Sequence, residues 1–121
     1  MAISRILVVD DSPTERFFLS ELLVKNGYLV SMAESGEEAV AQAKQTLPDL
    51  IVMDVVMPGM NGYQATRMIS KEDATKHIPV TMCTTKGQET DKVWGMRQGA
   101  KAYLVKPVKP EDLLSQIKAL G

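Results

Sequence analysis

The sequence is poor in the residues that often mark covalent or redox chemistry. Its 121 residues include one cysteine, one histidine and one tryptophan, and aromatic side chains account for 5%. The lone cysteine, Cys83, excludes an intramolecular disulfide, and its place in an apolar run favours a small buried side chain over a reactive thiol. The lone histidine, His77, stands in a predicted loop and does not support a role as a kinase.

The sequence also lacks an excess of charge and a long apolar run. Its 14 basic and 15 acidic residues leave a formal charge of -1, so we expect no nucleic-acid partner and no membrane partner. No apolar stretch approaches the roughly 20 residues of a membrane span, and residues 1–5 lack the features of a signal peptide. We therefore expect a cytoplasmic protein.

Length and composition predict one globular domain. A content of 45% hydrophobic and 24% charged residues is typical of a folded protein. A chain of 121 residues can form one core but not two ordinary domains. We expect residues 1–121 to form a single domain with no output domain.

Short apolar segments alternate with segments of helical periodicity. The expected strands are residues 6–9, 28–32, 50–54, 78–83 and 103–105. The expected helices are residues 13–26, 36–47, 63–71, 90–98 and 110–120. Five units of strand then helix predict an α/β fold with a parallel sheet, helices on both faces and right-handed crossovers.

Local patterns make finer predictions for three of the helices. Ser12 and Glu15 match a capping box, in which two residues at a helix start each bond the backbone of the other. Helical spacing places Leu47 on the inner face of the second helix and Met68 on the inner face of the third.

Polar residues follow four of the expected strands at their carboxyl ends. These residues are Asp10 and Asp11 after the first strand, Asp54 at the third, Thr84 at the fourth and Lys106 at the fifth. The carboxyl ends of parallel strands meet at one edge of the sheet, where ligands bind in open α/β folds. We therefore expect these side chains to meet there.

The chemistry of that edge favours a metal ion and a phosphoryl group. Three carboxylates repel one another and stay ionised only if cations compensate them. Lys106 supplies one positive charge, and a hard divalent cation suits the rest; Mg²⁺ fits best, and Mn²⁺ can replace it. A carboxylate, a metal ion, a lysine and a hydroxyl together suit phosphoryl transfer to an aspartate. A purely structural ion pair between Asp54 and Lys106 is the alternative.

The segments around these residues resemble the receiver domain of two-component response regulators. They are residues 8–12, 53–62, 79–85 and 99–107, and the resemblance covers essentially the whole chain. It implies a doubly wound, flavodoxin-like and CheY-like fold with strand order 2-1-3-4-5 and five helices. It also implies a receiver that takes phosphate from a histidine kinase, acts on an effector protein and is monomeric when unphosphorylated.

The resemblance implies a role for each acidic residue. Asp54 would be the phosphoacceptor. Asp10, Asp11 and Asp54 would hold Mg²⁺, and the backbone carbonyl of Val56 would add a ligand.

The resemblance also implies roles for the other residues at this edge. Thr84 would be the switch hydroxyl, Tyr103 its aromatic partner and Lys106 the cation that binds the phosphoryl group. The peptide bond between Lys106 and Pro107 would be cis. Trp94 would belong to a partner surface, since aromatic side chains anchor interfaces; packing in the core is the alternative.

A narrower resemblance is to the PilH-type stand-alone regulators of twitching motility. Residues 10–15, 62–67 and 84–100 carry it. It implies a chemotaxis-type histidine kinase and a system that controls type IV pilus twitching or phototaxis. The expected chemistry is limited to the chain's own phosphorylation and dephosphorylation, so we do not expect an enzyme.

Other functions stay open. A phosphate sink or a phosphorelay intermediate would use the same residues. A binding module without phosphorylation is disfavoured, because the full set of site residues is present. An aspartyl-phosphate phosphatase of the haloacid-dehalogenase type needs a second aspartate two residues after its nucleophile. Here Asp10 and Asp11 are adjacent and Ser12 follows, so that pattern fails.

Overall fold

The computed structural model describes residues 2–121, and in them five strands alternate with five helices. The strands are β1 (Arg5–Val9), β2 (Leu29–Ala33), β3 (Leu50–Met53), β4 (Val80–Thr84) and β5 (Ala102–Val105). The helices are α1 (Pro13–Lys25), α2 (Gly36–Thr46), α3 (Gly62–Lys71), α4 (Glu89–Arg97) and α5 (Pro110–Leu120). The predicted alternation is confirmed, and its boundaries differ from the expected ones by two residues or fewer.

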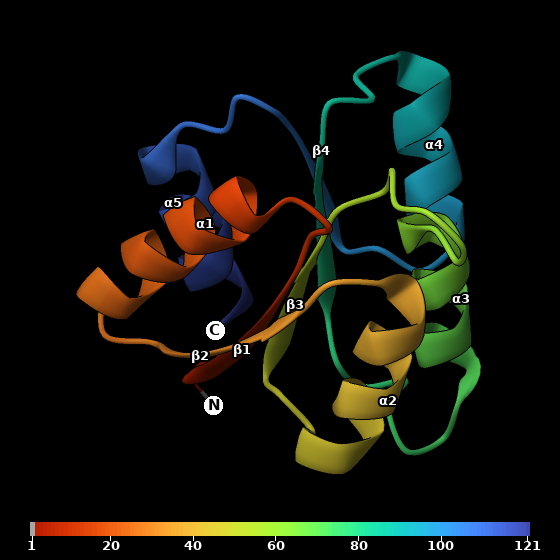
Figure 1. Cartoon of the computed structure of the whole chain (residues 1–121), viewed down its shortest axis with the longest axis horizontal. Coiled ribbons are helices and arrows are strands. Elements are labelled where there is room, and N and C mark those ends of the chain that lie inside the picture. Colours follow the sequence, from red (N-terminus) through yellow and green to blue (C-terminus); the bar gives the residue numbers. More distant parts are fainter. Residues whose placement is uncertain (1) are drawn as a thin grey trace.

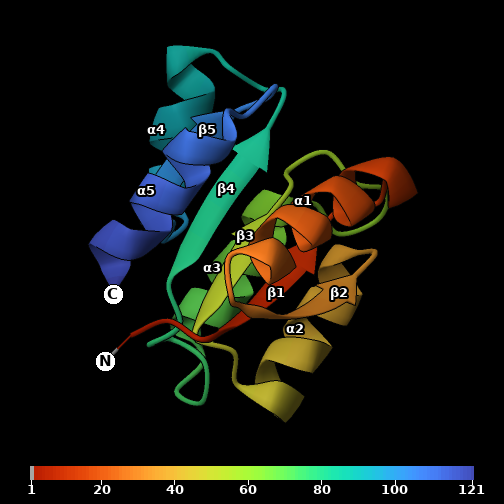
Figure 2. The ribbon, with the colours of Figure 1, turned by 90° about the vertical axis from the view of Figure 1, so that its left-hand side faces the viewer.

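The strands form one parallel sheet in the order β2-β1-β3-β4-β5. Helices α1 and α5 cover one face, and α2, α3 and α4 cover the other (Figure 1). Figure 2 shows the face with α1 and α5 in front of the sheet. This is the doubly wound, CheY-like arrangement that the resemblance implies. Within residues 2–121, no helix combines the length and apolar character needed to cross a bilayer.

The central strands β1 and β3 are buried on both faces, which explains why their sequences are continuous apolar runs. Alternate residues enter two separate cores. Those on the side of α2 and α3 are Leu7, Val9, Ile51 and Met53. Those on the side of α1 and α5 are Ile6, Val8, Leu50 and Val52. The two cores pack against the sheet from both sides.

The register of the sheet places the polar residues that follow the strands. The backbone N–H of Asp54 donates to the carbonyl of Val9 at 2.9 Å, which holds the end of β3 beside the end of β1. The N–H of Lys106 donates to the carbonyl of Thr84 at 2.8 Å, which does the same for β5 and β4. The residues just beyond these strands therefore leave the sheet side by side.

The start of α1 is where predicted, but its capping box is only half formed. The Ser12 hydroxyl accepts a hydrogen bond from the N–H of Glu15 at 3.4 Å. The Glu15 carboxylate does not complete the box and lies 3.8 Å from Lys106 Nζ. The N–H of Ser12, which would complete the box, donates instead to Asp10 Oδ1 at 2.9 Å.

Two residues expected in the core are exposed. Leu47 caps α2 in the left-handed conformation, with φ of 46°, and its side chain turns outward. Met68 lies beside Lys44 at the surface between α2 and α3. The buried face of α3 instead includes Thr66, which is fully buried.

Candidate functional site

Three carboxylates lie together at the carboxyl edge of the sheet. One oxygen from each of Asp10, Asp11 and Asp54 lies within 4.8 Å of the other two. Asp10 and Asp54 are buried, whereas Asp11 is exposed. The structure thus brings together the three acidic residues that follow the neighbouring strands β1 and β3.

Lys106 is the counter-charge of this group. Its Nζ lies 2.7 Å from Asp10 Oδ2 and 3.9 Å from Asp54 Oδ1. Burial acts to lower the pKa of Lys106, but the hydrogen bond to Asp10 and the negative charges of Asp54 and Glu15 outweigh it and raise that pKa. Lys106 therefore stays a cation. One positive charge against the three carboxylates leaves the site negative.

The negative charge of the Asp54 carboxylate is only partly compensated by its neighbours. Burial raises the pKa of Asp54 to about 6, and the negative charge of Asp10 adds to the effect. Lys106, the N–H of Val55 and the hydroxyl of Thr84 act in the opposite direction. The Val55 N–H donates to Asp54 Oδ1 at 2.8 Å. The anionic form of Asp54 therefore gains from any further cation that enters the site.

Thr84, rather than Thr85, is placed at the site. Thr84 is fully buried at the end of β4, whereas Thr85 is exposed. Thr84 Oγ1 accepts a hydrogen bond from the N–H of Lys86 at 3.3 Å, so its own hydrogen can point to another acceptor. The hydroxyl of Tyr103 donates to the carbonyl of the same Lys86 at 2.7 Å. Thr84 and Tyr103 thus share one loop residue as their partner.

Comparison with known proteins identifies the family. Residues 6–118 match the model of the response regulator receiver domain. The chain belongs to the response regulator receiver family. It is similar to the protein PilH of Pseudomonas aeruginosa, with 56% identity over 97% of each chain.

Two solved receiver structures have the same fold. The chemotaxis protein CheY4 of Vibrio cholerae is 36% identical, with a TM-score of 0.91 over 99% of this chain and 100% of that one. The receiver domain of the sensor histidine kinase PA1611 from Pseudomonas aeruginosa is 29% identical, with a TM-score of 0.90 over 98% of each chain. That structure holds a magnesium ion in its active-site cleft.

The acidic edge of this receiver fits Mg²⁺. Receiver domains bind this ion in an acidic pocket and take phosphoryl groups from histidine kinases. Here the donors are carboxylate oxygens, which hard divalent cations prefer, and they outnumber the one lysine beside them. Asp11 is exposed, so the site is open to the water molecules that Mg²⁺ retains.

Several predicted features of this receiver are visible, and one residue was missed. The Lys106–Pro107 peptide bond is cis, as predicted. The side chain of Trp94 is 49% exposed, so it lies at the surface rather than in the core. Sequence reasoning did not find Tyr63, whose hydroxyl lies 3.3 Å from that of Tyr103. Its position at the start of a helix gave no signal of this contact.

The raised pKa of Asp54 predicts how the stability of the variant Asp54→Asn depends on pH. Between 3.8 and about 6, Asp54 binds more protons in the folded chain than in the unfolded chain. The free energy of unfolding therefore falls as pH rises through that window. Asp54→Asn should remove this cost and raise the free energy of unfolding at pH 7 by about 1–2 kcal/mol. Urea unfolding without divalent cations should show the gain at pH 7 and its loss near pH 4.

Asp49 offers a matched control of opposite sign. The N–H groups of Arg5 and Ser4 lower its pKa. Asp49→Asn should therefore reduce stability at pH 7. If Asp54→Asn also reduced stability at pH 7, the electrostatic description of the site would be wrong.

Proposed function

We propose that this chain is a stand-alone cytoplasmic receiver that is phosphorylated on Asp54 and then changes its protein contacts. One observation carries the proposal: the buried Asp54 lies with two further carboxylates, and Lys106 stands 3.9 Å from it. A structural ion pair would need one acid for one base. This edge instead holds more acid than its lysine compensates, in a family that transfers phosphoryl groups.

In the proposed reaction, Asp54 is the nucleophile. An oxygen of its carboxylate forms a bond to phosphorus while the bond from phosphorus to the kinase histidine breaks, and the electron pair of that bond stays on the nitrogen. A divalent metal ion would be held by Asp10, Asp11, Asp54 and the backbone carbonyl of Val56. Mg²⁺, or Mn²⁺ in its place, would supply positive charge at the oxygens of the transferring group.

Three residues would act on the phosphoryl group or respond to it. Lys106 would bind one phosphoryl oxygen, and the Thr84 hydroxyl would donate to another. Tyr103 would be coupled to Thr84 through the backbone of Lys86, which both of them contact. We expect these residues to carry out the phosphorylation and dephosphorylation of the chain itself.

The output would pass through protein contact. The chain is proposed to be a single receiver domain over residues 1–121, monomeric when unphosphorylated, with the exposed Trp94 on its partner surface. The similarity to PilH supports a chemotaxis-type kinase and a system that controls twitching motility. An effector protein would recognise the phosphorylated form.

Transfer from a kinase tests the pathway. A purified chemotaxis-type histidine kinase, labelled on its histidine with radioactive phosphate, should pass the label to this chain in the presence of Mg²⁺. Chelation of the metal should stop the transfer, and hydroxylamine should release the label, as expected for an acyl phosphate. Label that stays on the kinase while the receiver is folded would contradict the proposed pathway.

A further inference from the structure

The first turn of α3 is built directly onto the backbone around Asp54. The N–H of Gly62 donates to the carbonyl of Val55 at 2.9 Å. A Cβ at position 62 would overlap the carbonyl oxygen of Asp54 and lie 2.8 Å from Val55 Cα. Only glycine allows this approach. The next residue, Tyr63, is therefore held at a fixed position relative to Asp54.

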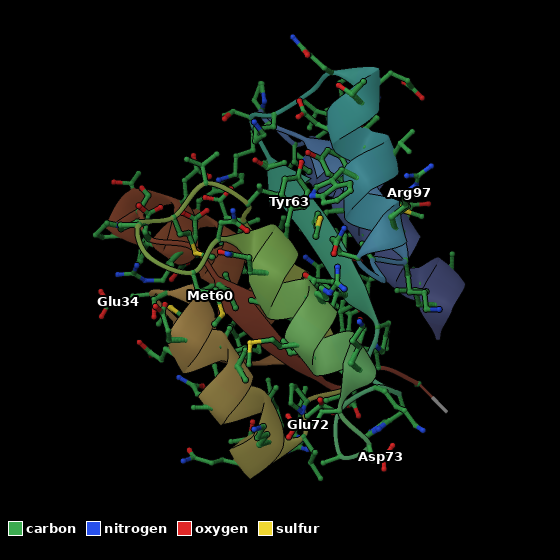
Figure 3. All side chains as sticks on the ribbon, turned by 90° about the vertical axis from the view of Figure 1, so that its right-hand side faces the viewer. Glu34, Met60, Tyr63, Glu72, Asp73 and Arg97 are labelled. Atoms are coloured by element: carbon green, nitrogen blue, oxygen red, sulfur yellow. The ribbon has the colours of Figure 1, made fainter. Side chains whose placement is uncertain are left out.

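Tyr63 reaches from α3 to the start of α4. Its hydroxyl lies 3.1 Å from the carbonyl oxygen of Asp91 and 3.3 Å from the hydroxyl of Tyr103. Tyr103 in turn lies 2.7 Å from the carbonyl of Lys86. Figure 3 shows Tyr63 at the end of α3 that faces α4. Two phenols, 40 residues apart in sequence, thus join three elements and the β4–α4 loop.

Counting hydrogens shows which bonds can form together. Each phenol has one hydrogen to donate. Tyr103 gives its hydrogen to the carbonyl of Lys86, its closest partner. Tyr63 can then give its hydrogen to Asp91 or to the oxygen of Tyr103. When Tyr63 donates to the oxygen of Tyr103, the Tyr103 hydrogen stays on Lys86 and the hydroxyls form one chain of hydrogen bonds. When Tyr63 donates to Asp91, no hydrogen is left between the two phenols. The first arrangement is the one in which Tyr63 holds Tyr103.

The ring of Tyr103 is also packed in that arrangement. A Cβ at Gly95 of α4 would lie 2.8 Å from the Tyr103 ring, so the helix rests against the ring. Burial raises the pKa of Tyr103 well above its usual range, and the hydrogen bond with Tyr63 adds to this. Its hydroxyl therefore remains a donor at any physiological pH.

Lys86 connects Tyr103 to Thr84 at the site. The carbonyl of Lys86 accepts from Tyr103, and its N–H donates to Thr84 Oγ1 at 3.3 Å. With its oxygen occupied by that N–H, Thr84 can direct its hydrogen toward Asp54. A phosphoryl group on Asp54 would need a donor at this place. The contacts therefore run in one chain from Tyr63 to the Thr84 hydroxyl.

We propose that Tyr63 is a positioning residue of the switch: its hydroxyl holds Tyr103 on the Lys86 carbonyl, so that Thr84 is oriented to bind a phosphoryl group before one arrives. The inference rests on the proposed function and deepens it. It assigns a role in the switch to a residue of α3, in addition to β4 and β5. It also places Tyr103 on the Lys86 carbonyl, coupled to Thr84, before phosphorylation.

Fluorine NMR can test the proposal in the intact chain. The sequence has three tyrosines, so a chain grown with 3-fluorotyrosine gives three resonances, which single Tyr→Phe variants assign. In the unsubstituted chain, the Tyr103 resonance should move little when Mg²⁺ and beryllofluoride, a mimic of the phosphoryl group, are added. In Tyr63→Phe, it should be shifted or broadened before the addition and return toward the unsubstituted position after it.

The affinity for beryllofluoride gives a second measurement. Tyr63→Phe keeps the ring and removes one hydroxyl, so we expect affinity to fall about three- to tenfold, the factor that one ordinary hydrogen bond supplies. Tyr28→Phe, on the opposite face of the sheet, is the matched control and should change nothing. Because Tyr63 acts through Tyr103, adding Tyr63→Phe to Tyr103→Phe should cause no further loss.

Failure of this inference differs from failure of the proposed function. If the unsubstituted chain does not bind beryllofluoride at all, the proposed function fails. If it binds, but Tyr63→Phe matches Tyr28→Phe in affinity and in the Tyr103 resonance, only the role of Tyr63 is overturned. A further loss of affinity in the double variant would also overturn it, because Tyr63 would then act independently of Tyr103.

Discussion

Replacing Lys106 with methionine is expected to slow phosphorylation of Asp54 by about 100-fold or more, the usual cost of removing a preorganised donor from a site of charge transfer. Lys106 is the cation nearest to both buried carboxylates of the site, at 2.7 Å from Asp10 and 3.9 Å from Asp54. Methionine keeps much of the side-chain volume and removes the charge. The rate of phosphoryl gain from acetyl phosphate in saturating Mg²⁺ measures the loss.

The same variant should bind Mg²⁺ more tightly. Without Lys106, the three carboxylates have no cation beside them, so a divalent ion gains more by entering. Lys101→Met, at an exposed lysine just before β5, is the control and should change neither property. Weaker Mg²⁺ binding in Lys106→Met, in a chain that remains folded, would show that Lys106 organises the site rather than compensating its charge.

Gly62→Ala should damage both the fold and the site. The added methyl group would overlap the carbonyl oxygen of Asp54 and press on Val55 Cα, and neither backbone atom can move without displacing the end of β3. We expect a loss of about 3 kcal/mol in the free energy of unfolding, at the upper end for overpacking. The misplaced nucleophile should also lower the phosphorylation rate by about 100-fold. Urea unfolding and intact mass measure the two effects.

Gly27→Ala is the control that separates a loss of stability from a loss of phosphorylation rate. Gly27 follows α1 with φ of 92°, so alanine is strained there, but a Cβ at this position meets nothing within 4 Å. This variant should lose about 1 kcal/mol, the cost of left-handed backbone for a residue with a side chain. It should keep its phosphorylation rate. A normal rate in Gly62→Ala would contradict the close packing of α3 on Asp54.

The sequence was sufficient to predict the alternating fold and the meeting of five polar residues at one edge. Both follow from rules that act along the chain: buried parallel strands are continuous apolar runs, and their carboxyl ends share an edge. Asp10, Asp54 and Lys106 are therefore found together, although the last two are 52 residues apart, the difference between their sequence numbers.

The details that the sequence did not predict depend on partners distant in the chain. The Glu15 carboxylate lies 3.8 Å from Lys106 Nζ, which is 91 positions further on by sequence number. Met68 is apolar and correctly spaced, yet it is exposed, and Thr66 on the same helix is fully buried. The pairing of Tyr63 with Tyr103 is likewise tertiary. Periodicity shows which residues share a face but not which neighbour that face meets.

The most direct measurement of the central claim is the intact mass of the chain after incubation with acetyl phosphate and Mg²⁺. We expect a gain of one phosphoryl group, no gain when the metal is chelated before the incubation, and no gain in Asp54→Asn. Because Asp54→Asn should be at least as stable as the unsubstituted chain, unfolding cannot explain a missing gain in that variant. A folded chain that gains no phosphoryl group, or an Asp54→Asn variant that still gains one, would contradict the assignment of Asp54 as the nucleophile.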